Sequence, residues 1–367
     1  MKHYKFLIIN SFDSTGGSTM RMRRLYDFVK RCGFEVKYIE SNSELPNYDT
    51  NVISVTQKNT VIGFLIGTIK RILYMLRLKY DVLIIQKLTP FTFPLILIAK
   101  LMNKIIIVDF DDWDSLLQDS FIFRFLFSFF ENLSFNLPTA YIVPTQLLMN
   151  VIIKKTKMKK PICIIPQGID VEKFNPEKYN KDKLRELMNF SKKQKIIGFL
   201  GCFTPGGIGE FEILLDCVIE LIRKNPDVYF LVIGGGRLLP KYKCKGNEKV
   251  IFTGTVKHYE VARLIAICDI MVIWMKQKRI GDYYKGTLKI IEYLAMNKSV
   301  VGYLVGDTLR RFGDFCYLVK TKQEFITVCE ELLKLEKRVN TYALIKDKYS
   351  YFSGLSEFKL FLKNLCK

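Results

Sequence analysis

Histidine and paired cysteines are scarce in this sequence, and each scarcity argues against a class of site. Two histidines, His3 and His258, are too few for a histidine-rich zinc site and argue against a Ser-His-Asp triad. Nine cysteines occur without a single C-x-x-C pair, and most of them lie in apolar stretches. We therefore expect reduced, buried thiols in a reducing compartment rather than disulfides.

An uninterrupted apolar run long enough to cross a membrane is also missing. The most apolar window, residues 121–143, contains Arg124, Glu131 and Pro138, whereas a spanning helix needs about 20 apolar residues in succession. The first four residues run directly into a strand-like block and show no signal-peptide pattern. We expect a cytoplasmic protein that is soluble or peripheral on the inner face of the membrane.

Acidic residues are in deficit. The 367 residues include 57 Lys and Arg against 36 Asp and Glu, so the formal net charge is +21. This excess indicates an anionic partner, which can be nucleic acid, an anionic membrane surface or a phosphorylated ligand. No RRM, KH, zinc-finger or helix-turn-helix pattern is recognisable, so we expect no nucleic acid. A basic nucleic-acid-binding protein stays the alternative that the charge alone favours.

Short β-rich runs alternate with helical patterns along most of the chain, as in parallel sheets covered on both faces. The expected strands are residues 6–10, 35–39, 82–86 and 105–109, then 196–200, 228–233, 250–252, 270–274 and 299–305. A Pro- and Gly-containing block, 161–176, separates the two series and has the composition of a linker. The sequence predicts an α/β fold of two Rossmann-like domains facing across a cleft, with ligands at the carboxyl ends of the strands.

The stretch 283–301 contains the most informative carboxylate. Gly286 and Thr287 precede a predicted helix at 287–296, where free backbone N–H groups and the positive helix end suit a phosphate. Glu292 lies at the border of the apolar stripe of that helix, where a carboxylate is costly unless it is hydrogen-bonded. A sugar hydroxyl would satisfy it, and so would an ion pair with Lys285 or Lys289.

Several blocks together resemble the retaining glycosyltransferases of family 4, which have the GT-B fold. IPQGIDVEKFNP (165–176) and GTLKIIEYLAMNKSVV (286–301) are similar to two of that family's signature stretches. Gly16-Gly17-Ser18 with Arg21 and Arg23 resembles the family's glycine loop after the first strand. Five further blocks resemble family motifs and follow one another in the same order as in the family: VDFDDWD (108–114), PTAYIVPTQLL (138–148), LVIGGG (231–236), VIFTGTV (250–256) and LIAICDIMVIW (264–274).

The resemblance implies a retaining, hexosyl-type transferase in glycan biosynthesis that uses a UDP- or GDP-linked sugar without a metal or other cofactor. The acceptor is then a glycan or a lipid-linked saccharide. We expect an acceptor-side domain at 1–160, a nucleotide-sugar domain at 161–345 and a helical tail at 346–367 that packs back on the first domain. The implied donor-binding residues are Gly16, Gly17, Gly201, Arg237, Thr255, Val256, Tyr284, Gly286, Thr287, Lys289 and Glu292, with the Glu292 carboxylate on the ribose.

The sequence departs from the family pattern at three places. Tyr284 stands where the family usually has a first glutamate, and the loop 201–209 lacks the cations that normally neutralise the diphosphate. Asp111 and Asp112 occupy the place of a histidine that many members have, and they could stabilise an oxocarbenium-like centre or orient the acceptor hydroxyl. A strand-end turn with Asx-type caps is the simpler interpretation of these aspartates. The proposed substitute cations are Lys285, which we group with Asp111 and Asp112 as catalytic, and Lys289, Arg237 and Arg279.

Two segments of the first half are both basic and apolar. Residues 63–80 form an amphipathic helix pattern, and residues 121–130 (FIFRFLFSFF) are unusually aromatic. Together they suit an anionic bilayer surface, although a domain helix with a solvated basic face fits the same pattern. A membrane-docked partner protein with a degenerate transferase site, and a sugar-nucleotide epimerase of the same architecture, remain further alternatives.

Overall fold

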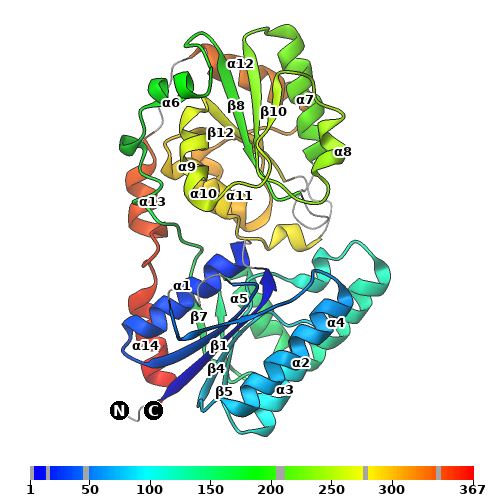
Figure 1. Ribbon diagram of the computed structural model, residues 1–367, viewed down its shortest axis with the longest axis vertical. Coiled ribbons are helices and arrows are strands. Elements are labelled where there is room, and N and C mark those ends of the chain that lie inside the picture. Colours follow the sequence, from blue (N-terminus) through cyan, green and yellow to red (C-terminus); the bar gives the residue numbers. More distant parts are fainter. Residues whose placement is uncertain (1–3, 14–16, 44–48, 204–210, 276–279, 336–339) are drawn as a thin grey trace. The chain divides into compact units, whose positions relative to one another are not determined.

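The computed structural model describes residues 4–13, 17–43, 49–203, 211–275, 280–335 and 340–367. Contacts divide the chain into two compact units (Figure 1). Unit 1 comprises Met1–Gly168, Tyr284–Gly286 and Phe352–Lys367, and unit 2 comprises Ile169–Tyr283 and Thr287–Tyr351. The sequence predicts boundaries at 160/161 and 345/346, whereas unit 1 extends to Gly168 at the first place and unit 2 extends to Tyr351 at the second.

Unit 1 is built on a parallel sheet whose described strands have the order β3-β2-β1-β4-β5-β6-β7. The strands are β1 (Lys5–Asp13), β2 (Glu35–Ser41), β3 (Val52–Val55), β4 (Val82–Gln86), β5 (Ile105–Asp109), β6 (Ala140–Val143) and β7 (Ile162–Ile164). The presence of β7 shows that the block read as a linker begins as a strand, because Ile162–Ile164 pairs in register with Tyr141–Val143.

Helices cover both faces of this sheet, and alternate strand residues point to opposite cores. One face is covered by α1 (Gly17–Arg31) and α14 (Leu355–Leu365), through residues such as Phe28 and Phe358. The other face carries α2 (Val61–Arg77), α3 (Phe93–Leu101), α4 (Phe121–Ser134) and α5 (Gln146–Lys155), with a short 3₁₀ helix, η2, at Asp114–Leu117. Figure 1 shows α2, α3 and α4 side by side on this face.

Unit 2 contains a second parallel sheet, with the strand order β10-β9-β8-β11-β12-β13 in its described part. The strands are β8 (Lys195–Leu200), β9 (Val228–Ile233), β10 (Val250–Phe252), β11 (Ile270–Trp274), β12 (Ser299–Tyr303) and β13 (Tyr317–Leu318). β9, β10 and β11 have the predicted bounds, and both series of alternating strands and helices are confirmed.

One face of the second sheet packs on α7 (Phe211–Lys224) and α12 (Lys322–Lys334), and the other face packs on α9 (His258–Ile267) and α10 (Leu288–Ala295). The remaining helices of unit 2 are α6 (Lys181–Leu187), α8 (Leu239–Lys243), α11 (Gly306–Phe312) and α13 (Tyr342–Tyr349), with 3₁₀ turns η3 (Pro176–Lys178), η4 (Ile280–Tyr283) and η5 (Gly313–Phe315). Within the described residues, no helix combines the length and the apolar character needed to cross a bilayer.

Candidate functional site

Three strands of unit 2 end in closely packed glycine turns. Gly234 has φ +120°, and a Cβ atom there would lie 2.0 Å from the carbonyl oxygen of Gly201. A Cβ atom on Gly235 would lie 2.2 Å from the Thr255 hydroxyl oxygen. The Phe203 N–H donates to the Gly235 carbonyl at 2.9 Å. The glycines therefore let the chain segments after β8, β9 and β10 approach one another at the carboxyl edge of the sheet.

Glu292 lies in the middle of α10 and is almost fully buried. Its side chain is 4% exposed, and its Oε1 atom lies 3.3 Å from Nε2 of His258, the first residue of α9. The ring of His258 packs edge-on against Phe174, with ring centroids 5.7 Å apart. The observed partner of Glu292 is thus a half-buried histidine. In the described part of the chain, Glu292 forms no ion pair with Lys289, one of the two partners that the sequence left open.

The helix that carries Glu292 is fixed in place on its other side. The Leu200 N–H, at the end of β8, donates to the Tyr293 hydroxyl oxygen at 2.8 Å. Thr287 is the N-cap residue of α10, but its side chain accepts no hydrogen bond from the first turn in the described structure. The start of α10 therefore has two features that favour binding of an anion. Its first-turn N–H groups have no side-chain cap, and the positive end of the helix dipole lies there.

The other expected donor residues of unit 2 lie around this edge with different surroundings. Lys289 places its ammonium group 5.0 Å from the centre of the Phe199 ring, in a cation–π contact. Arg237 and Thr255 are exposed, and Gly201 is buried. Arg279 and most of the cation-poor loop, residues 204–210, lie outside the described residues.

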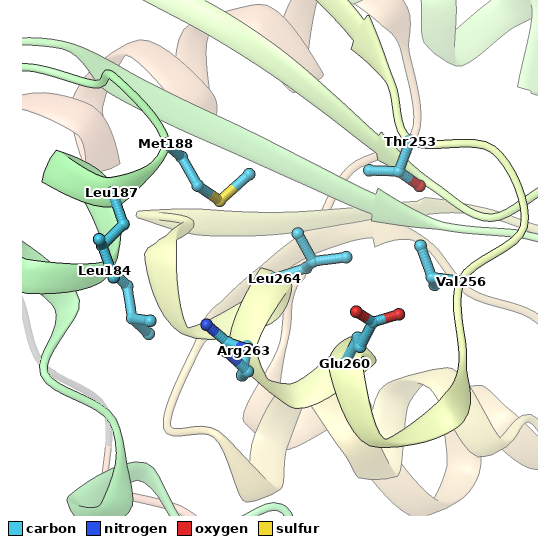
Figure 2. Close-up of a pocket in the computed structure, with 8 residues that line it drawn as sticks. All are labelled: Leu184, Leu187, Met188, Thr253, Val256, Glu260, Arg263 and Leu264. Carbon is cyan, nitrogen blue, oxygen red and sulfur yellow. The ribbon is translucent and has the colours of Figure 1, made fainter.

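Val256 lines an apolar pocket of about 320 Å³ between α6, α9 and the turn after β10 (Figure 2). Leu184 and Met188 form the α6 side, and Leu264 comes from α9. Figure 2 shows Glu260 and Arg263 as its charged neighbours. Glu292 is not among the lining residues. The Val256 side chain therefore lines a pocket that does not include Glu292.

In unit 1, the carboxyl ends of β4 and β5 carry a network of charged side chains. Asp109, the last residue of β5, accepts two hydrogen bonds from Nε and Nη2 of Arg21, both at 2.8 Å, and both side chains are buried. Nη1 of Arg21 donates to the Ile165 carbonyl at 2.8 Å. Asp109 is thus held in a forked ion pair that joins α1 to β5, rather than forming only a strand-end cap.

Lys87 follows β4 directly and is surrounded by three carboxylates. Its Nζ atom lies 2.9 Å from Asp114, 3.1 Å from Asp112 and 3.7 Å from Asp111. The backbone of Lys87 has φ +67°, a strained conformation for a residue with a side chain. In this unfavourable backbone conformation, the buried ammonium group of Lys87 lies close to the carboxylates of three aspartates.

Asp111 and Asp112 differ in their access to a ligand. Oδ2 of Asp111 accepts hydrogen bonds from Gln86 Nε2 at 3.1 Å and from the Ser18 hydroxyl at 3.2 Å. Asp111 is buried, whereas the Asp112 side chain is 24% exposed. Of the two expected catalytic aspartates, Asp112 is the one that a sugar hydroxyl can reach without displacing a protein contact.

Burial shifts three acids in and beside this network, Asp111, Asp114 and Glu131, towards their neutral forms. It raises the pKa of Asp111 to about 8, with repulsion from Asp112 and Asp109 adding to burial and Lys87 opposing it. The pKa of Asp114 is also raised by burial, although Lys87 and Lys285 draw it down. For Glu131 on α4, whose Oε1 accepts the Ser115 N–H at 2.9 Å, burial raises the pKa to about 7. The network can therefore hold a proton near neutral pH.

The short segment Tyr284–Gly286, which holds two expected donor residues and the expected catalytic Lys285, belongs to unit 1. Tyr284 packs edge-on against Trp113, with ring centroids 5.1 Å apart, and Lys285 acts electrostatically on Asp114. Gly286 completes this short segment of unit 1. Gly17 begins α1 and has no described heavy atom within 4 Å of its Cβ position, whereas Gly16 lies outside the described residues.

Sequence reasoning missed Lys87, Asp114 and the pairing of His258 with Glu292. Lys87 and Asp114 each follow a strand of the first sheet, and His258 opens the helix after β10. Polar residues just beyond parallel strands gather at one sheet edge, so this position was an available signal. In the described part of the chain, no group of three His, Cys, Asp or Glu side chains is arranged to hold a metal ion.

A family model described as glycosyl transferases group 1 matches residues 194–335, which run from the start of β8 to the end of α12 and include Glu292. No curated protein matches the sequence. The matched segment makes unit 2 glycosyltransferase-like.

Solved structures resemble the whole chain. Sucrose-phosphate synthase from Thermosynechococcus elongatus has a TM-score of 0.77 at 13% identity, covering 99% of both chains. The Anabaena protein HepE, in complex with UDP and glucose, has a TM-score of 0.71 at 14% identity, covering 99% of this chain and 100% of its own. UDP-GlcNAc 2-epimerase from Neisseria meningitidis, bound to UDP-GlcNAc, has a TM-score of 0.61 at 13% identity, covering 98% and 100%. The chain thus has the GT-B fold that the sequence predicted.

Proposed function

We propose that this protein is a retaining, hexosyl-type glycosyltransferase that moves a sugar from a UDP- or GDP-linked donor to a glycan or lipid-linked saccharide. The observation that carries the proposal is the buried Glu292 carboxylate beside His258, on a helix whose first turn has no side-chain cap. It lies within the segment that matches the glycosyl transferases group 1 model.

In this proposal the residues of unit 2 bind the donor. The Glu292 carboxylate accepts hydrogen bonds from the ribose hydroxyls, and His258 holds that carboxylate in place from the other side. The backbone of Thr287 and the start of α10 donate to the diphosphate, and Lys289 and Arg237 supply positive charge as the diphosphate leaves. The chain thus has cations of its own for the leaving group, and we propose a transfer that needs no added metal.

The charged network of unit 1 is assigned to the acceptor side. Asp112 is accessible enough to accept a hydrogen bond from an acceptor hydroxyl, while Lys87 fixes its position at 3.1 Å. Burial raises the pKa of Asp111 to about 8, which favours its neutral form near neutral pH, so we assign Asp111 no role as an anion at an oxocarbenium centre. This assigns different roles to the two aspartates that the sequence treated alike.

A thermal-shift panel of UDP-, GDP- and ADP-sugars tests the proposal, because a ligand that binds only the folded state raises the melting temperature. We expect one nucleotide class to stabilise the protein and Glu292→Gln to weaken that donor roughly 10- to 100-fold, since a charge-assisted hydrogen bond is lost. Glu248→Gln, at an exposed position of the same unit, is the matched control.

Product analysis separates the remaining functions. Transfer to an acceptor with retained anomeric configuration supports the proposal, and conversion of the donor sugar to its epimer assigns an epimerase instead. Binding of a donor without transfer or hydrolysis identifies a partner protein with a degenerate site. If no sugar nucleotide binds but random DNA binds at better than micromolar affinity with steep salt dependence, the charge of +21 serves nucleic acid.

A further inference from the structure

The apolar stripe of α2 faces away from the sheet that the helix packs on. The buried positions of α2 include Gly63, Gly67 and Arg71, whereas Ile62 and Ile69 are 70% and 58% exposed. At 3.6 residues per turn these two sets lie on opposite sides of the helix. An amphipathic helix of a globular domain normally turns its apolar stripe to the core, so α2 is oriented the other way round.

Two glycines keep α2 in this orientation. A Cβ atom on Gly63 would lie 2.2 Å from the carbonyl oxygen of Lys58, and one on Gly67 would lie 2.2 Å from Oε1 of Gln57. Arg71, on the same inner side, donates to Gln57 Oε1 at 2.8 Å. At Gly63 and Gly67 the inward face is therefore shaped for close approach, and a leucine or isoleucine side chain would not fit at either position.

The aromatic helix α4 shows the same inversion. Its buried residues are Glu131 and Ser134, whereas Phe121, Ile122 and Phe125 are 81%, 75% and 66% exposed. Glu131 is anchored inward by the Ser115 N–H, which fixes which side of α4 meets the domain. The fully buried residues of α4 are thus polar, and most of its apolar residues face solvent.

The exposed residues of α2 and α4 belong to one surface, because α3 contacts both helices. The rings of Phe64 on α2 and Phe91, just before α3, stack at 5.0 Å, and the rings of Phe93 on α3 and Phe130 on α4 lie 5.2 Å apart. Figure 1 shows the three helices side by side. We call this surface the apolar helix face. Its exposed members are Val61, Ile62, Leu65, Ile66, Ile69, Leu73, Leu76, Leu97, Leu101, Phe121, Ile122, Phe123, Phe125, Leu126, Phe129 and Leu133.

The apolar helix face is too large to be incidental. It holds more than half of the large apolar side chains that are exposed in the described chain. Its phenylalanines alone expose on the order of 500 Å², about as much as the largest apolar patch of a typical soluble monomer. A surface of this size marks an interaction site.

The charges around the face select its partner. Residues 50–108, which contain α2 and α3, include eight basic residues and one acidic residue, Asp81, and one exposed acid, Asp119, precedes α4. Lys70 and Arg77 are exposed beside the apolar stripe of α2, as is Lys100 on α3 and Arg124 on α4. The one acidic residue within the three helices, Glu131, is buried. An apolar centre with basic neighbours complements a bilayer whose surface is anionic.

We propose that the apolar helix face docks on an anionic membrane surface, with its aromatic and aliphatic side chains in the interfacial region and its cations on lipid phosphates. A second copy of the chain fits less well, because a face lined with cations would meet the same cations. Docking deepens the proposed function, because it would place the enzyme at the surface where a lipid-linked acceptor lies. Only this link to the acceptor rests on the proposed function, and the docking itself does not.

Vesicle flotation tests the docking with the full-length protein and no sugar nucleotide, so its outcome is independent of the donor assays. We expect binding to vesicles in which a third of the phosphatidylcholine is replaced by phosphatidylglycerol, and weak binding to phosphatidylcholine alone. The double variant Ile122→Ser, Phe125→Ser is expected to bind about tenfold more weakly. Leu360→Ser, 60% exposed on α14 on the opposite face of the sheet, is the matched control and is expected to bind like the parent.

A second pair of variants tests the charges. Lys70→Gln with Arg77→Gln is expected to reduce binding to the phosphatidylglycerol vesicles and its dependence on salt, whereas Lys359→Gln with Lys363→Gln on α14 is expected to leave both unchanged. Equal binding to neutral and anionic vesicles would overturn the charge argument. Failure to bind either vesicle, or a dimer in solution that Phe125→Ser dissolves, would overturn the membrane as the partner.

Discussion

Replacing Lys87 with methionine tests whether the three aspartates of unit 1 form one charge network. Methionine keeps the length and apolar stem of lysine but removes the ammonium group, which lies within 3.7 Å of a carboxylate oxygen of each aspartate. Removing one partner from a buried ion pair costs about 3–5 kcal/mol, because the remaining charges stay buried without compensation. For a unit of this size that corresponds to a melting temperature lower by about 6–20 °C.

The loss of stability in Lys87→Met must also depend on pH, and the direction of that dependence follows from the raised pKa of Asp111. A carboxyl whose pKa is higher in the folded than in the unfolded state stabilises the fold at low pH, and this contribution is lost as pH rises towards about 8. Lys87 opposes that rise, so without it the folded-state pKa values of Asp111 and Asp114 move further up. The gap in stability between the parent and Lys87→Met is therefore expected to widen from pH 5 to pH 9.

Tryptophan fluorescence can follow unit 1 alone. The chain has two tryptophans, and Trp113 lies next to the network while Trp274 belongs to unit 2. In a Trp274→Phe background, denaturant unfolding at several pH values reports on the environment of Trp113. Lys79→Met, at an exposed position of the same unit, is the control. A loss below about 1 kcal/mol at pH 8, or one that does not change with pH, would refute the coupled network.

Three further substitutions separate structural from ligand-binding roles. Gly17→Ala is expected to leave the free energy of unfolding unchanged or raise it by up to about 1 kcal/mol, since the Cβ position of Gly17 is open. A higher KM for the donor would indicate that the ligand approaches Gly17 closely, and an unchanged KM would contradict that contact. Gly234→Ala, at φ +120° and 2.0 Å from a carbonyl oxygen, is expected to destabilise unit 2 by more than about 2 kcal/mol in calorimetry. His258→Ala is expected to weaken donor binding about tenfold with little change in melting temperature. If isothermal titration calorimetry shows the same donor affinity as the parent, His258 does not contribute to donor binding.

The architecture was predictable because buried parallel strands leave a strong signal in sequence. Runs such as VLIIQ and IMVIW contain almost no polar residues, and a run of this kind suits a strand covered on both faces. β7 was missed because Ile162–Ile164 lies between prolines, and short edge strands of three residues look like loops when read locally. Its pairing with β6 is a tertiary fact that no local pattern contains.

The candidate site was predictable only in part, because partners across a sheet edge are distant in sequence. The position of Glu292 on the helix border signalled a carboxylate in need of a partner, but its contact with His258, 34 residues away, depends on how α9 and α10 pack. Lys87 shows the same limit. A single lysine after an apolar strand has no distinctive spacing, and its role follows from the aspartates that β5 brings to the same edge.

The orientation of α2 shows most clearly what a sequence pattern leaves undetermined. Periodicity in residues 63–80 establishes that one side of a helix is apolar, but the same periodicity results whether that side meets the core or the solvent. The direction is decided by the opposite side, where Gly63, Gly67 and Arg71 leave space for and bind Gln57 and the chain near Lys58. Small and hydrogen-bonding residues opposite an apolar stripe are therefore the signal that such a helix is turned outward, and α4, with Glu131 and Ser134 inward, shows the same signal.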